Sequence, residues 1–155
     1  MIKKIILGTD HAGFKLKEEL KKFLINEGFE VEDVGAHKLD PHDDYPDFIS
    51  KAAKKVAKNQ ESRGIIFGAS GQGEAIVANK IPGIRATLYY GSNIDIVKLS
   101  RTHNDANILS LAARFLTKEE AIEAVKIWLK TDFSKEKRHV RRLKKISKIE
   151  EKTCK

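Results

Sequence analysis

Short apolar segments alternate with amphipathic stretches along most of this chain, and this alternation limits the folds open to it. Five segments are expected to be strands, at residues 2–7, 29–34, 64–67, 84–88 and 108–111. The stretches between and after them are expected to be helices, at 13–27, 45–56, a short piece ending at 80, 92–100, 117–129 and 135–149. Strands that alternate with helices form parallel sheets covered on both faces. The expected fold is therefore a three-layer α/β/α sandwich with a five-stranded parallel Rossmann-like sheet.

Length and composition are those of one ordinary globular domain. The chain has 155 residues, of which 41% are hydrophobic and 34% charged. Residues 1–133 are expected to form the α/β body, and residues 134–155 a basic C-terminal helix and tail of the same domain. No apolar run approaches the roughly 18 residues that span a membrane, and no signal peptide is visible, so a cytoplasmic protein is expected. The single cysteine, Cys154, excludes a disulfide framework and a cysteine metal cluster.

Positive charge is concentrated at the C-terminus. The chain carries a net charge of +8, and residues 135–155 contain ten Lys or Arg and three Glu. Such a tail could bind nucleic acid or another polyanion, but a solvated helix face explains it more simply. Arg138 and Arg142 are four residues apart and would share one helix face.

The stretch from Gly68 to Lys80 is the strongest local signal of a binding site. It reads GASGQGEAIVANK and follows the apolar segment 65–67. A turn of small residues between a strand and a helix presents backbone N–H groups to an oxyanion, and Glu74 lies in the first helical turn. The stretch matches neither common phosphate-binding fingerprint, so a tight turn that needs only small residues is the alternative.

The order of strands divides the polar candidates between two edges of the sheet. In open parallel sheets, ligands bind beyond the carboxyl ends of the strands. Asp10, His11, the turn and Arg114 all follow strands, so we expect them at that edge. His103 and Asn104 precede the fifth strand and belong at the opposite edge. If His103 acts together with Glu74, it must come from another subunit.

Four motifs occur in an order that points to a known family. They are GTDHAGFK at 8–15, DYPDF at 44–48, the glycine turn, and RTHNDAN at 101–107. Together they resemble the ribose-5-phosphate isomerase B family, which also holds the galactose-6-phosphate isomerase subunits, from residue 2 to about 146. Many members of that family carry a cysteine base where this chain has Gly68. A second branch uses a glutamate after the last glycine of the turn, and Glu74 matches that branch.

The resemblance implies an aldose–ketose isomerase that needs no cofactor or metal and acts as a homodimer or tetramer with shared sites. Ribose 5-phosphate and ribulose 5-phosphate would interconvert through a cis-enediolate. Glu74 would be the base, Asp10 a proton relay, and His103 the acid–base group that opens the sugar ring. The enediolate would be bound by the Ser70 hydroxyl and by the turn N–H groups, which belong to Ala69, Ser70, Gly71, Gln72 and Gly73. The substrate ligands would be His11, Asn104, Arg114, Arg138 and Arg142.

Each of these residues also has a simpler explanation. Glu74 could only complement the helix dipole. Its place in a first helical turn favours the charged form of the carboxyl, whereas burial favours the neutral form, and the sequence leaves that balance open. Asp10 could be an N-cap, and His103 a surface residue. His139, between the two arginines, could support its neighbours.

Other functions compete with the leading hypothesis. The same chemistry could act on galactose 6-phosphate or allose 6-phosphate, since one extra CHOH group is a modest difference to discriminate. A non-catalytic phosphosugar-binding module and a nucleic-acid-binding protein that uses the basic tail are the alternatives of another class. A metal site in the loop that carries His37 and His42, together with Asp40, Asp43 and Asp44, is disfavoured because such loop residues are usually solvated. Tyr45 could cover the sugar.

Overall fold

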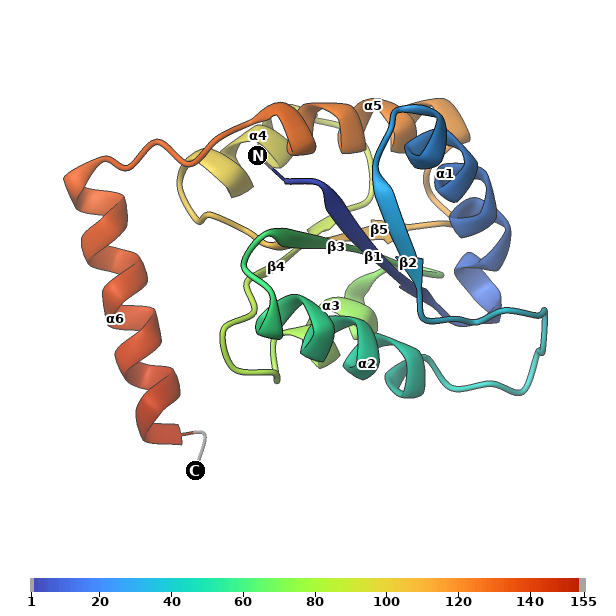
Figure 1. The fold of residues 1–155 in the computed structure, drawn as a ribbon, viewed down its shortest axis with the longest axis horizontal. Helices are drawn as coiled ribbons and strands as arrows, with labels where there is room; N and C mark the ends of the chain where they lie inside the picture. The colour runs from blue at the N-terminus through green and yellow to red at the C-terminus, as the bar shows by residue number, and fades with distance from the viewer. Residues whose placement is uncertain (1, 154–155) are drawn as a thin grey trace.

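The computed structural model describes residues 2–153 and shows one parallel five-stranded sheet with strand order β2-β1-β3-β5-β4 (Figure 1). Cys154 lies outside the described residues. The strands are β1 (Lys4–Thr9), β2 (Glu30–Asp33), β3 (Ser62–Gly68), β4 (Ala86–Tyr89) and β5 (Ile108–Ala112). This sheet and its helices confirm the expected fold class.

Helices cover both faces of the sheet. Helices α1 (Phe14–Asn26), α4 (Asp95–Thr102) and α5 (Lys118–Lys130) pack on one face, and α2 (Tyr45–Lys58) and α3 (Gln72–Ala78) on the other (Figure 1). A short 3₁₀ turn, η1 (His11–Gly13), precedes α1, and α6 (Lys137–Thr153) stands apart from the body beyond the sheet. Within residues 2–153 no helix has the length and apolar character needed to cross a membrane.

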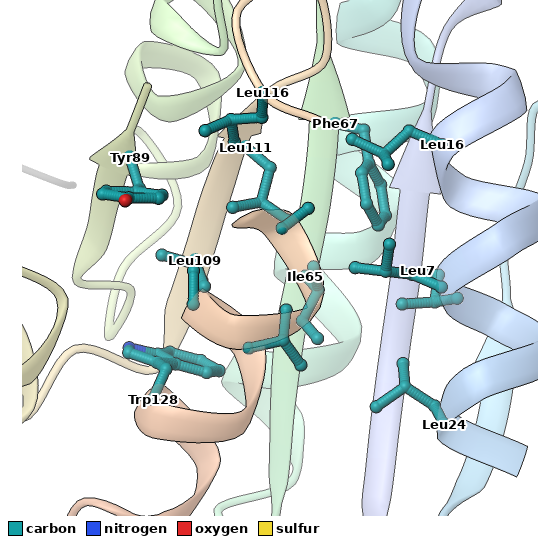
Figure 2. Packing of buried hydrophobic residues seen from close by; sticks show 14 of the residues in the cluster. Leu7, Leu16, Leu24, Ile65, Phe67, Tyr89, Leu109, Leu111, Leu116 and Trp128 are labelled. Atoms are coloured by element: carbon teal, nitrogen blue, oxygen red, sulfur yellow. The ribbon is translucent and has the colours of Figure 1, made fainter. Parts of the chain in front are cut away.

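The core consists of two layers, one on each face of the sheet. Leu7, Ile65 and Leu109 belong to the layer that packs against α1 and α5, in which Leu109 and Ile65 lie near Trp128 and Leu7 lies toward Leu24 (Figure 2). Ile6 and Ile66 point to the opposite face and pack against α2 and α3. Successive side chains of a strand alternate between faces, and both faces here are covered. This explains why the central strands read as continuous apolar runs rather than as an alternation.

The predicted elements all exist, but several boundaries differ. Strand β1 was expected to end at residue 7 and continues to Thr9. The reason is a non-local pairing, because the Thr9 N–H donates to the Gly35 carbonyl and the Thr9 carbonyl accepts from Ala36, each at 2.7 Å. Helix α6 was expected over 135–149 and runs to Thr153. The capping box of α5 is present as expected, between Thr117 and Glu120.

The connectivity brings two loops together at one point of the sheet. The chain leaves β1 for β2 on one side and returns to β3 on the other side, so β1 and β3 are neighbours. Thr9 pairs with Phe67, which places the ends of both strands side by side. A β-carbon on Gly13 would collide with Phe67, so η1 packs tightly against the end of β3. Such a switch point is where α/β sheets bind ligands.

Candidate active site

The glycine turn is held in place by a residue on a neighbouring strand. Gly71 has φ +73°, in the left-handed region that favours glycine. The hydroxyl of Ser110, on β5, donates to the Gly71 carbonyl at 2.7 Å. The Ser70 hydroxyl accepts from the Gln72 N–H at 3.4 Å. Within residues 2–153 the N–H groups of Ser70 and Gly71 have no protein acceptor, so the turn offers free donors.

Glu74 is buried directly beside this turn, with only 4% of the residue exposed. Its carboxyl group lies against Gly68, so closely that a β-carbon at position 68 would overlap it. Burial raises the pKa of Glu74, and the nearby Asp10 charge raises it further, whereas its own backbone N–H acts in the opposite direction. Burial therefore outweighs the helix-start position, which settles the balance that the sequence left open.

Asp10 and His11 lie at the adjacent end of β1. Asp10 is buried, and one of its carboxylate oxygens accepts the Ala12 N–H at 3.0 Å, as an N-cap residue does. The Nδ1 atom of His11 lies 2.7 Å from Oδ1 of Asp43, which also accepts the His11 backbone N–H. The hydrogen bond to Asp43 raises the pKa of His11, so the imidazole is more cationic near neutral pH than a free histidine.

Arg114 and Tyr45 complete this side of the site. The Arg114 N–H donates to the Ala69 carbonyl at 3.1 Å. The Tyr45 ring lies against Gly73, where a β-carbon would be 2.8 Å from its hydroxyl oxygen. We call this group the carboxyl-edge cluster; its members are Asp10, His11, residues 69–73, Glu74 and Arg114.

The remaining predicted residues gather elsewhere. His103 ends α4 at the opposite edge of the sheet, before β5, and its ring stacks on that of His139 at 4.2 Å between centroids and 16° between planes. Asn104, Arg138 and Arg142 are exposed. We call His103, Asn104, Arg138, His139 and Arg142 the amino-edge cluster. One chain does not bring the two clusters together.

The role of His139 is defined by this stack. Its ring is buried, and its Nε2 atom has no hydrogen-bond partner within residues 2–153. Burial lowers the pKa of His139, and the charges of His103 and Arg138 lower it further. His139 therefore supports the ring of His103, a contact that the sequence did not indicate.

One group of side chains has the spacing of a cation site. Ligand atoms of Asp10, His11 and Asp43 all lie within 4.8 Å of one another. Here the His11 Nδ1 atom is hydrogen-bonded to Asp43. His37 and His42 are exposed and do not join this group. Asp43 is thus hydrogen-bonded to His11 and not to the loop histidines. The two residues are 32 positions apart, so no local sequence pattern indicates this pairing.

Comparison with known proteins assigns the chain to a family. The ribose/galactose isomerase family matches residues 5–146. The chain belongs to this family. It is 38% identical over 147 residues to a ribose-5-phosphate isomerase B of Mycolicibacterium paratuberculosis, an alignment that covers 95% of this chain and 91% of that protein.

Solved structures of the family agree with this assignment. Ribose-5-phosphate isomerase B from Mycoplasma genitalium, with ribulose-5-phosphate bound, superposes with a TM-score of 0.91 at 38% identity and covers 97% of each chain. The Clostridium thermocellum ribose-5-phosphate isomerase B has a TM-score of 0.89 at 45% identity, covering 96% of this chain and 98% of that one. The family expected from the four motifs is therefore confirmed.

Proposed function

We propose that this protein is an aldose–ketose isomerase that interconverts ribose 5-phosphate and ribulose 5-phosphate. The observation that carries the proposal is the buried Glu74 carboxyl with a raised pKa, set beside free N–H donors of the glycine turn. A base needs a pKa near the working pH, and an enediolate needs fixed donors. The similarity to a family member with ribulose-5-phosphate bound supports this substrate class.

The reaction follows from the carboxyl-edge cluster. Glu74 removes the proton from C2 of the open-chain aldose, and the electron pair forms the C1–C2 double bond of the cis-enediolate. The turn N–H groups and the Ser70 hydroxyl stabilise the charge that develops on the sugar oxygens. Asp10 moves a proton from the oxygen on C2 to the oxygen on C1. Glu74 then returns its proton to C1, which gives the ketose and restores the carboxylate.

Cationic groups hold the phosphate of the substrate. His11 is made more cationic by Asp43, and Arg114 lies in the same cluster. Arg138 and Arg142 add forked donors that match phosphate oxygens. We assign His103 to opening of the sugar ring, with Asn104 as a further substrate ligand.

The separation of the two clusters supports a shared site in a two-fold dimer. The clusters lie at opposite edges of a sheet whose strands typically span about 17 Å. An apolar groove of about 640 Å³ lies between α6, α4 and the edge strand β4, and Ile96, Leu99 and Ile149 are exposed there. A second copy would cover this groove and bring its amino-edge cluster to the first copy's Glu74.

One assay tests the assignment. Purified protein is incubated separately with ribose 5-phosphate, allose 6-phosphate and galactose 6-phosphate, and kcat/KM is compared. The proposal expects ribose 5-phosphate to give the highest value, unchanged by EDTA. A higher value for a six-carbon sugar phosphate would transfer the same chemistry to that substrate. Absence of turnover with all three sugars would contradict the isomerase assignment and favour a non-catalytic phosphosugar-binding module.

A further inference from the structure

A second, polar cavity lies at the amino-terminal edge of the sheet. Its volume is about 480 Å³, and it sits where β3 begins, between the end of α2 and the loops that flank β4. Its charged lining residues are Arg63, Arg85, Arg101 and Asp105. It shares no residue with the carboxyl-edge cluster or with the amino-edge cluster.

Arg63 is a buried cation without a carboxylate partner. The residue is 6% exposed, and its Nη1 atom donates to the carbonyls of Trp128 and Leu129 at 3.1 and 3.2 Å, in the last turn of α5. Within residues 2–153 no carboxylate lies within ion-pair distance of its guanidinium. Burial and the neighbouring charge of Arg101 lower the pKa of Arg63 to about 10, which still leaves it charged at neutral pH.

The other two arginines share a single carboxylate. Asp105 accepts from Arg85 at 3.0 Å and from Arg101 at 2.9 Å. Three guanidinium groups therefore line the cavity with one carboxylate, and the charge of Asp132 nearby also acts on Arg63 and Arg101. Counting both carboxylates, this partly enclosed polar space keeps an excess of one positive charge. A buried cation is costly when it is unpaired. A phosphate monoester carries close to two negative charges at neutral pH, and guanidinium forks match its oxygens.

We propose that this cavity binds a small phosphate-bearing metabolite, whose phosphate pairs with Arg63 between Arg85 and Arg101. The cavity is larger than a free phosphate needs, so an organic part also fits. Carbonyl groups occupy only the Nη1 atom of Arg63, and its Nε and Nη2 donors have no protein acceptor within residues 2–153. The guanidinium groups of Arg63 and Arg101 also lie over the Trp128 ring, at 5.3 and 5.9 Å from its centroid. Capping of α5 and contact with this ring still leave the Nε and Nη2 donors of Arg63 without an acceptor.

A ligand in the cavity would affect the segment around His103 through its contact with Arg85. The Arg85 side chain donates to the carbonyls of Asn104 and Asp105, each through Nε at 3.0 Å. A phosphate that draws Arg85 and Arg101 away from Asp105 loosens this anchor, and His103 is only two residues earlier. The effect on catalysis rests on the ring-opening role proposed for His103, whereas binding in the cavity does not.

Calorimetric titration with glycerol 3-phosphate tests the proposal on the full chain. The wild type is expected to bind two molecules per chain, one at each edge of the sheet. Arg63→Gln is expected to weaken binding in the Arg63 cavity at least tenfold, and Arg114→Gln is expected to weaken binding at the carboxyl-edge cluster at least tenfold. The proposal would be overturned if Arg63→Gln still bound two molecules. It would also be overturned if the wild type bound a single molecule and Arg63→Gln bound that molecule equally well.

A rim variant tests the cavity without disturbing α5. Gln60 is an exposed lining residue whose side chain has no hydrogen bond within residues 2–153. Gln60→Glu is expected to lower the affinity of the Arg63 cavity for glycerol 3-phosphate at least tenfold, because the new carboxylate repels the phosphate. Lys54→Gln changes the net charge equally on an exposed residue of α2 outside the cavity, and is expected to bind as the wild type does. Equal affinities in the two variants would contradict the assignment.

Two further measurements define the ligand and the coupling. Citrate, a carboxylate probe, is expected to bind the cavity more weakly than glycerol 3-phosphate, and tighter binding would overturn the phosphate assignment. In Arg114→Gln, glycerol 3-phosphate is expected to shift the NMR signal of the His103 ring. An unmoved signal at saturation would overturn the coupling. Neither readout depends on isomerase activity, so an inactive enzyme would refute the proposed function and leave this site standing.

Discussion

The carboxyl group of Glu74 occupies the space in which any side chain at position 68 would begin. Only glycine leaves that space open, because a β-carbon there would overlap the Glu74 carboxyl. The two positions are six residues apart, one at the end of β3 and one in α3. This location beside the glycine turn therefore holds either the Glu74 carboxyl group or a side chain at position 68, but not both.

Gly68→Ala should therefore damage the site through Glu74. The methyl group forces the carboxyl group away from the turn, so we expect kcat to fall by about 100-fold or more and the free energy of unfolding by roughly 1–3 kcal/mol, as in an overpacked core. The control is the same change in a Glu74→Ala background, where the space is empty and Gly68→Ala should cost little stability. Additive losses in thermal unfolding of the double variant would contradict the overlap.

Glu74→Gln should separate activity from stability. Loss of the base is expected to lower kcat by roughly 10²–10⁴-fold. Because the folded-state pKa of Glu74 is raised, ionisation of this carboxyl costs stability as pH rises above the ordinary glutamate value. The neutral amide avoids that cost, so the variant should have a Tm equal to or above that of the wild type at pH 7. This advantage should vanish below about pH 4, and a Tm gain that persists there would refute the explanation.

Arg138→Ala and Arg142→Ala should each raise KM more than they lower kcat. Both would bind a phosphate whose charge does not change in the reaction, so their contribution is largely uniform between substrate and transition state. Arg141→Ala is the matched control, since Arg141 is exposed beside the cavity formed by lysines on the other face of α6. Steady-state kinetics with ribose 5-phosphate distinguishes the three variants. An unchanged KM in the first two would place the phosphate site elsewhere.

His139→Phe should make stability less sensitive to acid. The folded-state pKa of His139 is lowered, so below the ordinary value near 6.5 the unfolded chain binds a proton that the folded chain does not. The stabilisation that neutral His139 contributes is therefore fully present above that pH, and it is lost as pH drops toward the folded-state pKa. Phenylalanine preserves burial and stacking against His103 without titrating. The fall in Tm between pH 7.5 and 5.5 should be smaller than in the wild type, and an equal fall would exclude this role.

Two inactive variants should restore activity when their subunits mix. In the proposed two-fold dimer, each site would combine Glu74 of one chain with His103 of the other. When Glu74→Gln and His103→Ala are unfolded together and refolded, about half of the dimers are mixed, and each mixed dimer has one intact site. Activity should return to about a quarter of the wild-type value. No recovery from verified mixed dimers, or a monomeric mass in solution, would defeat the shared site.

The sequence by itself determined the local features of this protein. Periodicity placed all five strands and the helices between them, and Thr117 with Glu120 predicted the start of α5. These signals are local, because hydrophobic spacing, caps and turns involve residues a few positions apart. The order of strands also located Asp10, Glu74 and His103 at their edges of the sheet. Strand ends were less certain because distant partners set them, as Gly35 does for Thr9.

Only the tertiary structure decided how the site residues are tuned. The direction of the Glu74 pKa depends on burial against Gly68 and on the nearby Asp10. The charge of His11 depends on Asp43, and the stack of His103 on His139 joins residues 36 positions apart. The cavity of Arg63 and Arg101 likewise forms only when β3, α4 and the end of α2 meet. Such contacts depend on which surfaces pack together, and no pattern along the chain encodes the distance between two side chains from remote segments.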